Sequence, residues 1–126
     1  MKKKVIVIHS DNFVLLGLKA FFQEIGLECF DTKDLEEVYF GCPPPIDDPD
    51  VTAFISSYDW KSEGTNGVEV IRRAQSQRPD LTFILLSLAH VRGKEEEVGA
   101  NFIERKIGDE CGSGSPVRAE IARLLR

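Results

Sequence analysis

Three residues whose side chains could act together on a phosphoryl group stand at the ends of apolar stretches of the chain. Asp59 follows one such stretch, and its carboxylate could attack phosphorus as a nucleophile. The hydroxyl of Ser87 and the ammonium of Lys106 could then bind the equatorial oxygens of the same group. Taken singly, each residue also has an ordinary interpretation, such as a turn residue for Asp59. The chemistry therefore depends on whether the fold brings the three together.

The apolar stretches have the pattern of strands that are buried on both faces. Continuous runs rich in β-branched residues are typical of parallel sheets. We expect five strands, over Val5–Ile8, Leu27–Phe30, Val51–Tyr58, Leu81–Ala89 and Asn101–Arg105.

Helical patterns separate these strands. One helix face runs from Val14 to Ile25, with Ser10 or Asp11 as its cap and Gly26 as its end. Further helices are expected over Gly67–Gln77, over Asp31–Phe40 on a weaker pattern, as a short segment within Val91–Val98, and after the cap Ser115-Pro116. The stretches "GCPPPIDDPD" and "GDECGSGS" are expected to be loops.

Strands that alternate with helices predict one α/β domain over residues 1–126, a doubly wound parallel sheet with helices on both faces. In such a sheet, binding sites lie at the carboxyl ends of the strands. Asp59, Ser87, Lys106 and the segment His9–Asp11 all follow strand ends, so we expect them around one crevice.

Composition and charge exclude several classes of function. The net charge is -5, the pI is about 5.1, and the only basic run is Lys2–Lys4, which argues against nucleic-acid binding by this domain. No apolar run is long enough for a signal sequence or a membrane span. The three cysteines, Cys29, Cys42 and Cys111, are far apart and have no nearby His, which predicts a reducing compartment, the cytoplasm.

Several motifs together resemble the receiver domain of bacterial two-component response regulators, over essentially the whole chain. "VIVIHSDNFVLLGLKAFF" resembles the first strand and helix of that family, and "DW" followed by "TNG" resembles the phosphoacceptor region of the chemotaxis receiver. "FILLSLA" and "GANFIERK" resemble the fourth and fifth strands. The resemblance implies a flavodoxin-like sheet in the order 2-1-3-4-5. It also implies Asp59 as the phosphoacceptor, Ser87 as the switch hydroxyl and Lys106 as the phosphate contact.

The chain departs from the family pattern where that family binds magnesium. His9 and Ser10 stand at the positions of an acidic pair, and Asp11 comes one place later. Mg²⁺ prefers carboxylates and waters, so Asp11 and Asp59 would form at most a weak Mg²⁺ site, and capping the first helix is the other role of Asp11. Other family positions are also replaced, by Glu63, Ile103 and Ile107. These changes predict an atypical or pseudo-receiver.

His9 has two possible roles. It could donate a proton or bind a transition metal beside Asp59, or it could be bonded to the backbone at the strand end. The second role is the commoner one for a histidine in this position.

Three functions remain open. The first is a receiver-like domain that signals by binding a protein, with impaired Mg²⁺-dependent phosphorylation. The second is a working receiver that a histidine kinase phosphorylates on Asp59, in which case its only reaction is self-catalysed phosphoryl transfer. The third, a hydrolase with Asp59 as nucleophile, ranks last, since Lys61 replaces the second Asp that the haloacid-dehalogenase phosphatases require and no G-x-S-x-G elbow is present.

The expected partners are a histidine kinase or another signalling protein, with no membrane and no nucleic acid. A homodimer through the last strand and helix is a further possibility. In receivers the fourth helix, fifth strand and fifth helix form a signalling face, which here would include Arg92, Lys94, Phe102, Glu104, Arg118 and Arg123.

Overall fold

Five parallel strands form the central sheet of the computed structural model, which describes residues 3–34, 38, 45–60 and 64–125. Their order across the sheet is β2-β1-β3-β6-β7, and each neighbouring pair is parallel. Counted along the chain, this is the predicted order 2-1-3-4-5, so the expected doubly wound sheet is confirmed. The strands are β1 (Lys4–Ile8), β2 (Glu28–Thr32), β3 (Val51–Ser56), β6 (Thr82–Ser87) and β7 (Asn101–Glu104).

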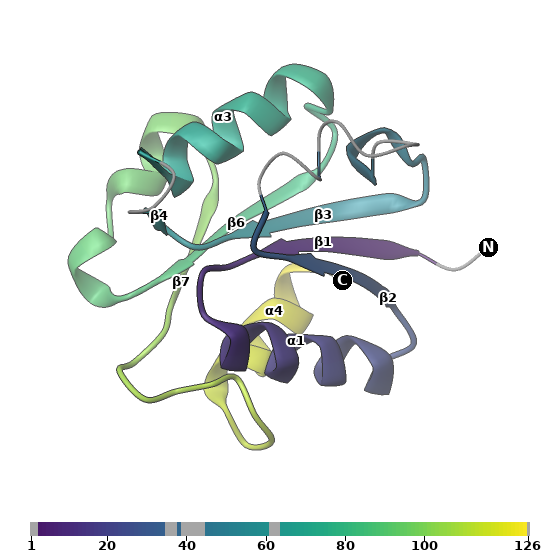
Figure 1. The fold of residues 1–126 in the computed structure, drawn as a ribbon, viewed down its shortest axis with the longest axis vertical. Helices are drawn as coiled ribbons and strands as arrows, with labels where there is room; N and C mark the ends of the chain where they lie inside the picture. The colour runs from purple at the N-terminus through teal and green to yellow at the C-terminus, as the bar shows by residue number, and fades with distance from the viewer. Residues whose placement is uncertain (1–2, 35–37, 39–44, 61–63, 126) are drawn as a thin grey trace.

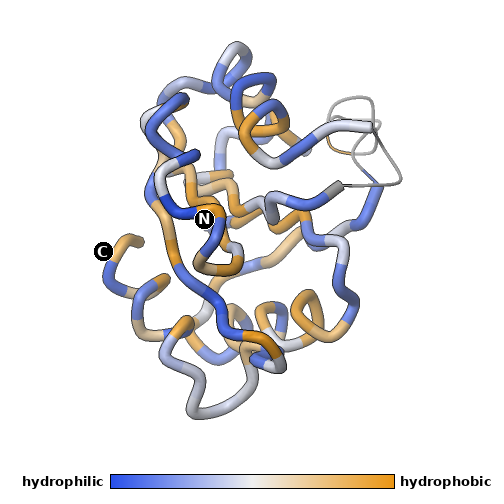
Figure 2. The backbone as a smooth tube through the Cα atoms, turned by 90° about the vertical axis from the view of Figure 1, so that its left-hand side faces the viewer, coloured by the Kyte–Doolittle hydropathy of each residue, from blue (hydrophilic) through white to orange (hydrophobic). Residues whose placement is uncertain are grey.

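Helices cover both faces of this sheet. The helices α1 (Asn12–Glu24) and α4 (Pro116–Leu124) lie on one face, and α3 (Gly67–Gln77) lies on the other (Figure 1). Two separate clusters of buried apolar side chains result, one on each face of the sheet. Figure 2 shows hydrophobic strands at the centre of the molecule, between the two helical layers.

The local sequence explains where the helices begin. The carboxylate of Asp11 accepts a hydrogen bond of 2.9 Å from the Phe13 N–H and caps α1. Asn66 caps α3 by accepting from the Glu69 N–H at 3.1 Å, and Ser115 caps α4 ahead of Pro116. These caps matter for the site, because two of them stand at the carboxyl edge of the sheet.

The fourth helical segment is reduced to two short 3₁₀ turns, η3 (Ala89–Val91) and η4 (Lys94–Val98). Gly93 and Gly99 bound the second turn with φ angles of 106° and 66°, a conformation that side chains other than glycine rarely adopt. The expectation of a short helix within Val91–Val98 is therefore confirmed, although the turn is 3₁₀ and not α.

Several predicted boundaries were wrong. The third strand ends at Ser56 and not at Tyr58, and β2 runs on to Thr32, where a helix was expected to have begun. Most of the rest of the helix expected over Asp31–Phe40 lies outside the described residues, although Val38 is helical and buried. The proline-rich loop contains one 3₁₀ turn, η1 (Pro45–Asp47).

A two-stranded antiparallel hairpin lies beyond the end of β3, at the left of Figure 1. It consists of β4 (Asp59–Trp60) and β5 (Thr65–Asn66), with Asp59 paired to Asn66. No helix within the described part of the chain is long and apolar enough to span a membrane.

Candidate site at the carboxyl edge of the sheet

The end of β1 is organised by hydrogen bonds to the backbone. The imidazole Nδ1 of His9 accepts a hydrogen bond of 3.0 Å from the Asp11 N–H, and the Asp11 carboxylate caps α1. Of the two roles expected for His9, the hydrogen bond to the backbone at the strand end is therefore the one observed. Its hydrogen bond holds Asp11 at the point where the strand turns into the helix.

His9 is also held in its neutral form. Its side chain is almost fully buried, and burial, together with the positive charge of Arg105, lowers the pKa of the imidazole to about 4, against a small opposing effect of Asp11. At neutral pH the end of β1 therefore presents an uncharged ring where the family pattern has a carboxylate.

The side chains at this strand end do not match what Mg²⁺ requires. His9 offers a neutral ring, Ser10 a hydroxyl, and Asp11 a single carboxylate, one oxygen of which caps α1. Mg²⁺ prefers charged oxygen ligands in a near-octahedral arrangement. Within the described ranges, no group of three His, Cys, Asp or Glu side chains could hold a metal ion.

Asp59 does not lie at the end of β3 but in the segment that follows this strand. Ile8 pairs with Ser56, and the Ser57 N–H donates to the Ile8 carbonyl at 3.0 Å, so Ser57 is level with His9. Asp59 follows two residues later, exposed, in the hairpin that leads to α3. The Gly67 N–H donates to the Tyr58 carbonyl at 2.8 Å and ties this hairpin to the start of the helix.

Ser87 and the residues before Lys106 come together across two neighbouring strands. The Arg105 N–H donates a hydrogen bond of 2.8 Å to the Ser87 carbonyl, so β6 and β7 end side by side. Ser87 is buried, whereas Lys106 is exposed and lines a depression of about 360 Å³ together with His90 and Arg105. Among the described residues, Asp59 and Lys106 form no ion pair.

Sequence reasoning missed Arg105, whose positive charge acts on His9 at the end of β1. Its side chain is half-buried and close enough to lower the pKa of His9, and its guanidinium donates to the Asp109 carbonyl at 2.9 Å. No local pattern marks Arg105, because it follows the end of β7 and the alternation of a strand does not extend to it.

The loop after β7 was expected to be a plain Gly/Ser connection, but it is held in place. Asp109 accepts hydrogen bonds from the Cys111 N–H at 2.8 Å and from the Ser115 hydroxyl at 2.9 Å. Cys111 is buried with a φ of 59°, which is unusual for a residue with a side chain. This loop packs against α1 at Gly17.

Comparisons with known proteins give a fold but no close relative. No protein-family model matches the chain, and no curated protein matches it either. Solved structures do match along the whole length. The response regulator TrrA of Thermotoga maritima, bound to Mg²⁺ and beryllofluoride, has a TM-score of 0.73 at 19% identity and covers 98% of this chain and 99% of its own.

Two more structures agree with that match. The beryllofluoride-activated DrrB receiver domain has a TM-score of 0.72 at 20% identity, covering 99% of this chain and 98% of that chain. TrrA in complex with the histidine kinase ThkA gives 0.70 at 20% identity, with 100% of both chains covered. The resemblance drawn from the sequence is therefore confirmed in three dimensions. The chain has the fold of response regulator receiver domains.

Proposed function

We propose that the chain is a cytoplasmic receiver-like signalling domain that acts by binding a protein partner, without Mg²⁺-dependent phosphorylation of Asp59. The observation that carries this proposal is the end of β1, where neutral His9 is bonded to the backbone and Asp11 is committed to capping α1. Phosphoryl transfer between anionic oxygens needs a cation to neutralise charge. This strand end offers too few carboxylates to hold one.

The position of Asp59 supports the same proposal. A phosphoryl group on Asp59 would have to reach both Ser87 and Lys106 to change the conformation of the domain. Asp59 lies in an exposed hairpin three residues beyond the end of β3, while Ser87 is buried at the end of β6. The geometry therefore favours a binding surface over a phosphate switch.

Exposed apolar side chains at this edge provide the binding surface. Phe13 and Leu16, both 61% exposed, lie three residues apart on α1, and Ile107 is 90% exposed just after β7. The loop that begins near Ile107 reaches α1 at Gly17, where the carbonyl groups of Glu110 and Cys111 lie against the helix. Isolated exposed apolar residues are common, but three large ones on adjoining segments mark an interaction site.

The proposed partner is a histidine kinase. The structural neighbour TrrA has been solved in complex with the kinase ThkA, and apolar side chains on a helix suit packing against a helical partner. A homodimer through β7 and α4 is a second mode of association. There a depression of about 480 Å³ is lined by Phe102, Glu120 and Arg123 among others.

A working receiver is the second candidate function, favoured by the adjacency of Ser87 and the segment leading to Lys106. Titration with beryllofluoride and Mg²⁺, followed by backbone amide NMR, separates the two functions. We expect no saturable shifts at Ser87 and Arg105. Saturable shifts there that require Mg²⁺ and vanish in Asp59→Asn would establish the working receiver.

Partner binding is tested with the dimerisation domains of the histidine kinases of the same organism. Asp59→Asn should bind like the wild-type protein, because the substitution keeps the shape of the side chain. Ile107→Glu should weaken binding by about five-fold or more, the effect of losing an apolar anchor. Arg72→Glu, at an exposed position of α3 on the other face of the sheet, serves as a charge control. Loss of binding in Asp59→Asn alone would contradict the proposal.

A further inference from the structure

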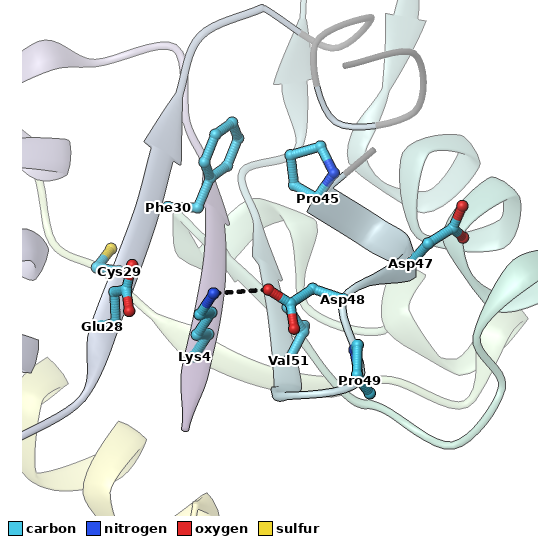
Figure 3. A pocket seen from close by; sticks show the side chains of 9 residues that line it. All are labelled: Lys4, Glu28, Cys29, Phe30, Pro45, Asp47, Asp48, Pro49 and Val51. Atoms are coloured by element: carbon cyan, nitrogen blue, oxygen red, sulfur yellow. Dashed lines mark hydrogen bonds and ion pairs between the residues drawn. The ribbon is translucent and has the colours of Figure 1, made fainter. Parts of the chain in front are cut away.

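A second pocket lies at the opposite, amino edge of the sheet, far from the candidate site in the fold. It has a volume of about 420 Å³ and is formed where β1, β2 and β3 begin, next to η1. Figure 3 shows the rings of Phe30 and Pro45 on either side of its upper part, with Lys4 and Asp48 joined below them. Nothing in the proposed function uses this pocket.

The walls of the pocket are apolar. Phe30, Pro45 and Val51 line it, and Phe30 also packs against the core on the α3 face. The neighbouring Cys29 packs against the core on the α1 face, and burial raises the pKa of its thiol to about 12, so it is neutral at physiological pH. A cavity of this size, with apolar walls and the charged side chains of Lys4, Glu28, Asp47 and Asp48 around it, is of the kind that holds small organic molecules.

The charge at the pocket is predominantly negative. The Lys4 ammonium lies 2.7 Å from the Asp48 carboxylate and is therefore already paired, while the exposed Lys3 adjoins Glu28 through its backbone. The hydrogen bond to Asp48, with the charges of Glu28 and Asp50, raises the pKa of Lys4, which places two more carboxylates near the same ammonium. Glu28 is exposed on the rim and forms no ion pair with any described residue.

A second cation at this edge, Arg78, offsets only part of the surplus of carboxylates. Arg78 pairs with Asp80 at 3.0 Å and donates to the carbonyl oxygens of Ile46, Asp48 and Val51. Its guanidinium is therefore committed to holding the segment that leads into β3. The same hydrogen bonds hold one wall of the pocket in a fixed shape.

We propose that this pocket binds a small amphipathic organic cation, with an aromatic or branched apolar body between Phe30 and Pro45 and an ammonium group near Glu28. The apolar walls supply most of the binding, and the surplus of carboxylates selects a positive charge over a negative one. A small molecule fits better than a peptide, because the pocket is a compact, partly open hollow whose described lining comes from the starts of three strands and from η1.

The test compares two probes of similar size and opposite charge, 2-phenylethylamine and 3-phenylpropionate, by backbone amide NMR on the whole chain. We expect the amine to give saturable shifts at Phe30, Asp48 and Val51, and the carboxylate to bind more weakly or not at all. Equal binding of both probes, or no saturable shift from the amine, would overturn the proposal.

Two substitutions with the same change of charge locate the ammonium group. Glu28→Gln should weaken binding of the amine by about two- to five-fold, the range for a solvent-exposed ion pair. Glu97→Gln, on the exposed turn η4, should leave it unchanged. The amide spectrum without ligand shows whether each variant is folded. Equal affinity in wild type and Glu28→Gln, or binding of a basic peptide where the amine fails, would contradict the proposal.

Discussion

The guanidinium of Arg118 donates a hydrogen bond of 3.1 Å to the carbonyl oxygen of Gly17, joining α4 to α1 across 101 residues of sequence. The same side chain donates to the Cys111 carbonyl at 2.8 Å, pairs with Glu24 and is only 13% exposed. Arg118 therefore holds two helices and the loop after β7 together. Its expected place on an exposed signalling face was wrong.

Arg118→Ala should destabilise the protein by about 2–4 kcal/mol, because it leaves two carbonyl groups without their charged donor. Arg123 provides the matched control, since within the described part of the chain its exposed side chain pairs with Glu120 alone, on the same helix. Arg123→Ala should change the free energy of unfolding by no more than about 0.5 kcal/mol. Urea denaturation measures both. Equal effects would show that the Arg118 contacts contribute little.

Gly17→Ala should also destabilise the protein, although alanine is the better helix former. A Cβ atom at Gly17 would lie 2.1 Å from the carbonyl oxygen of Glu110, which is backbone and cannot simply turn away. The gain in helix propensity, about 1 kcal/mol, is smaller than the cost of moving the loop.

Gly112→Ala is the control for this substitution. Gly112 has open space around its Cβ position and does not have a positive φ, so alanine there should be neutral or stabilise by up to about 1 kcal/mol. A stable Gly17→Ala variant would mean that the loop after β7 is free to move, and the described packing against α1 would be wrong.

The sheet and its helices could be predicted because burial patterns are local. Strands such as β6 are continuous apolar runs, and helices such as α3 carry their own cap, so its predicted bounds, Gly67–Gln77, were those observed. Strand ends were less predictable. The apolar pattern of β3 continues into Ser57 and Tyr58 after the last paired residue, since side chains remain buried where the strand no longer pairs.

The arrangement of the site depends on contacts that no local pattern contains. The roles of Arg105 and Arg118 come from the path of the loop after β7, which brings residues from distant parts of the chain to α1 and to His9. From the sequence alone both side chains are ordinary surface arginines. The resemblance to receivers supplied the candidates, but it could not show that Asp59 lies two residues beyond Ser57.

Stability should depend on pH through His9. The pKa of the imidazole is about 4 in the folded protein and about 6.5 when unfolded, so the unfolded state binds the extra proton first. The contribution of neutral His9 to the free energy of unfolding is complete above pH 6.5. It is lost as the pH falls towards 4, at up to about 1.4 kcal/mol per pH unit.

Urea denaturation at pH 7 and pH 5 measures this dependence. His9→Asn keeps an acceptor for the Asp11 N–H but cannot titrate, so its stability should fall less between the two pH values than that of the wild-type protein. His90→Gln removes the other histidine, which is exposed, and should retain the wild-type slope. If the stability of His9→Asn fell as much between pH 7 and pH 5 as that of the wild-type protein, groups other than His9 would account for the pH dependence.

Magnesium binding should be weak in the wild-type protein and should improve when the acidic pair of the family is restored. In the variant His9→Asp with Ser10→Asp, two carboxylates replace a neutral ring and a hydroxyl, while Arg105 offsets part of the added charge. Each carboxylate near a divalent ion contributes on the order of a few kcal/mol, so we expect the affinity to rise roughly ten-fold or more.

The fluorescence of Trp60, the only tryptophan, reports on this site because it follows Asp59 in the chain. The double variant should show a saturating response to Mg²⁺, and adding Asp59→Asn to it should weaken that response if Asp59 serves as the third carboxylate. The single variant Ser10→Asp separates the two positions, since it leaves the buried imidazole in place. A saturating response of the wild-type protein well below a millimolar would show that Asp11 and Asp59 suffice to bind the ion, and would favour the working receiver.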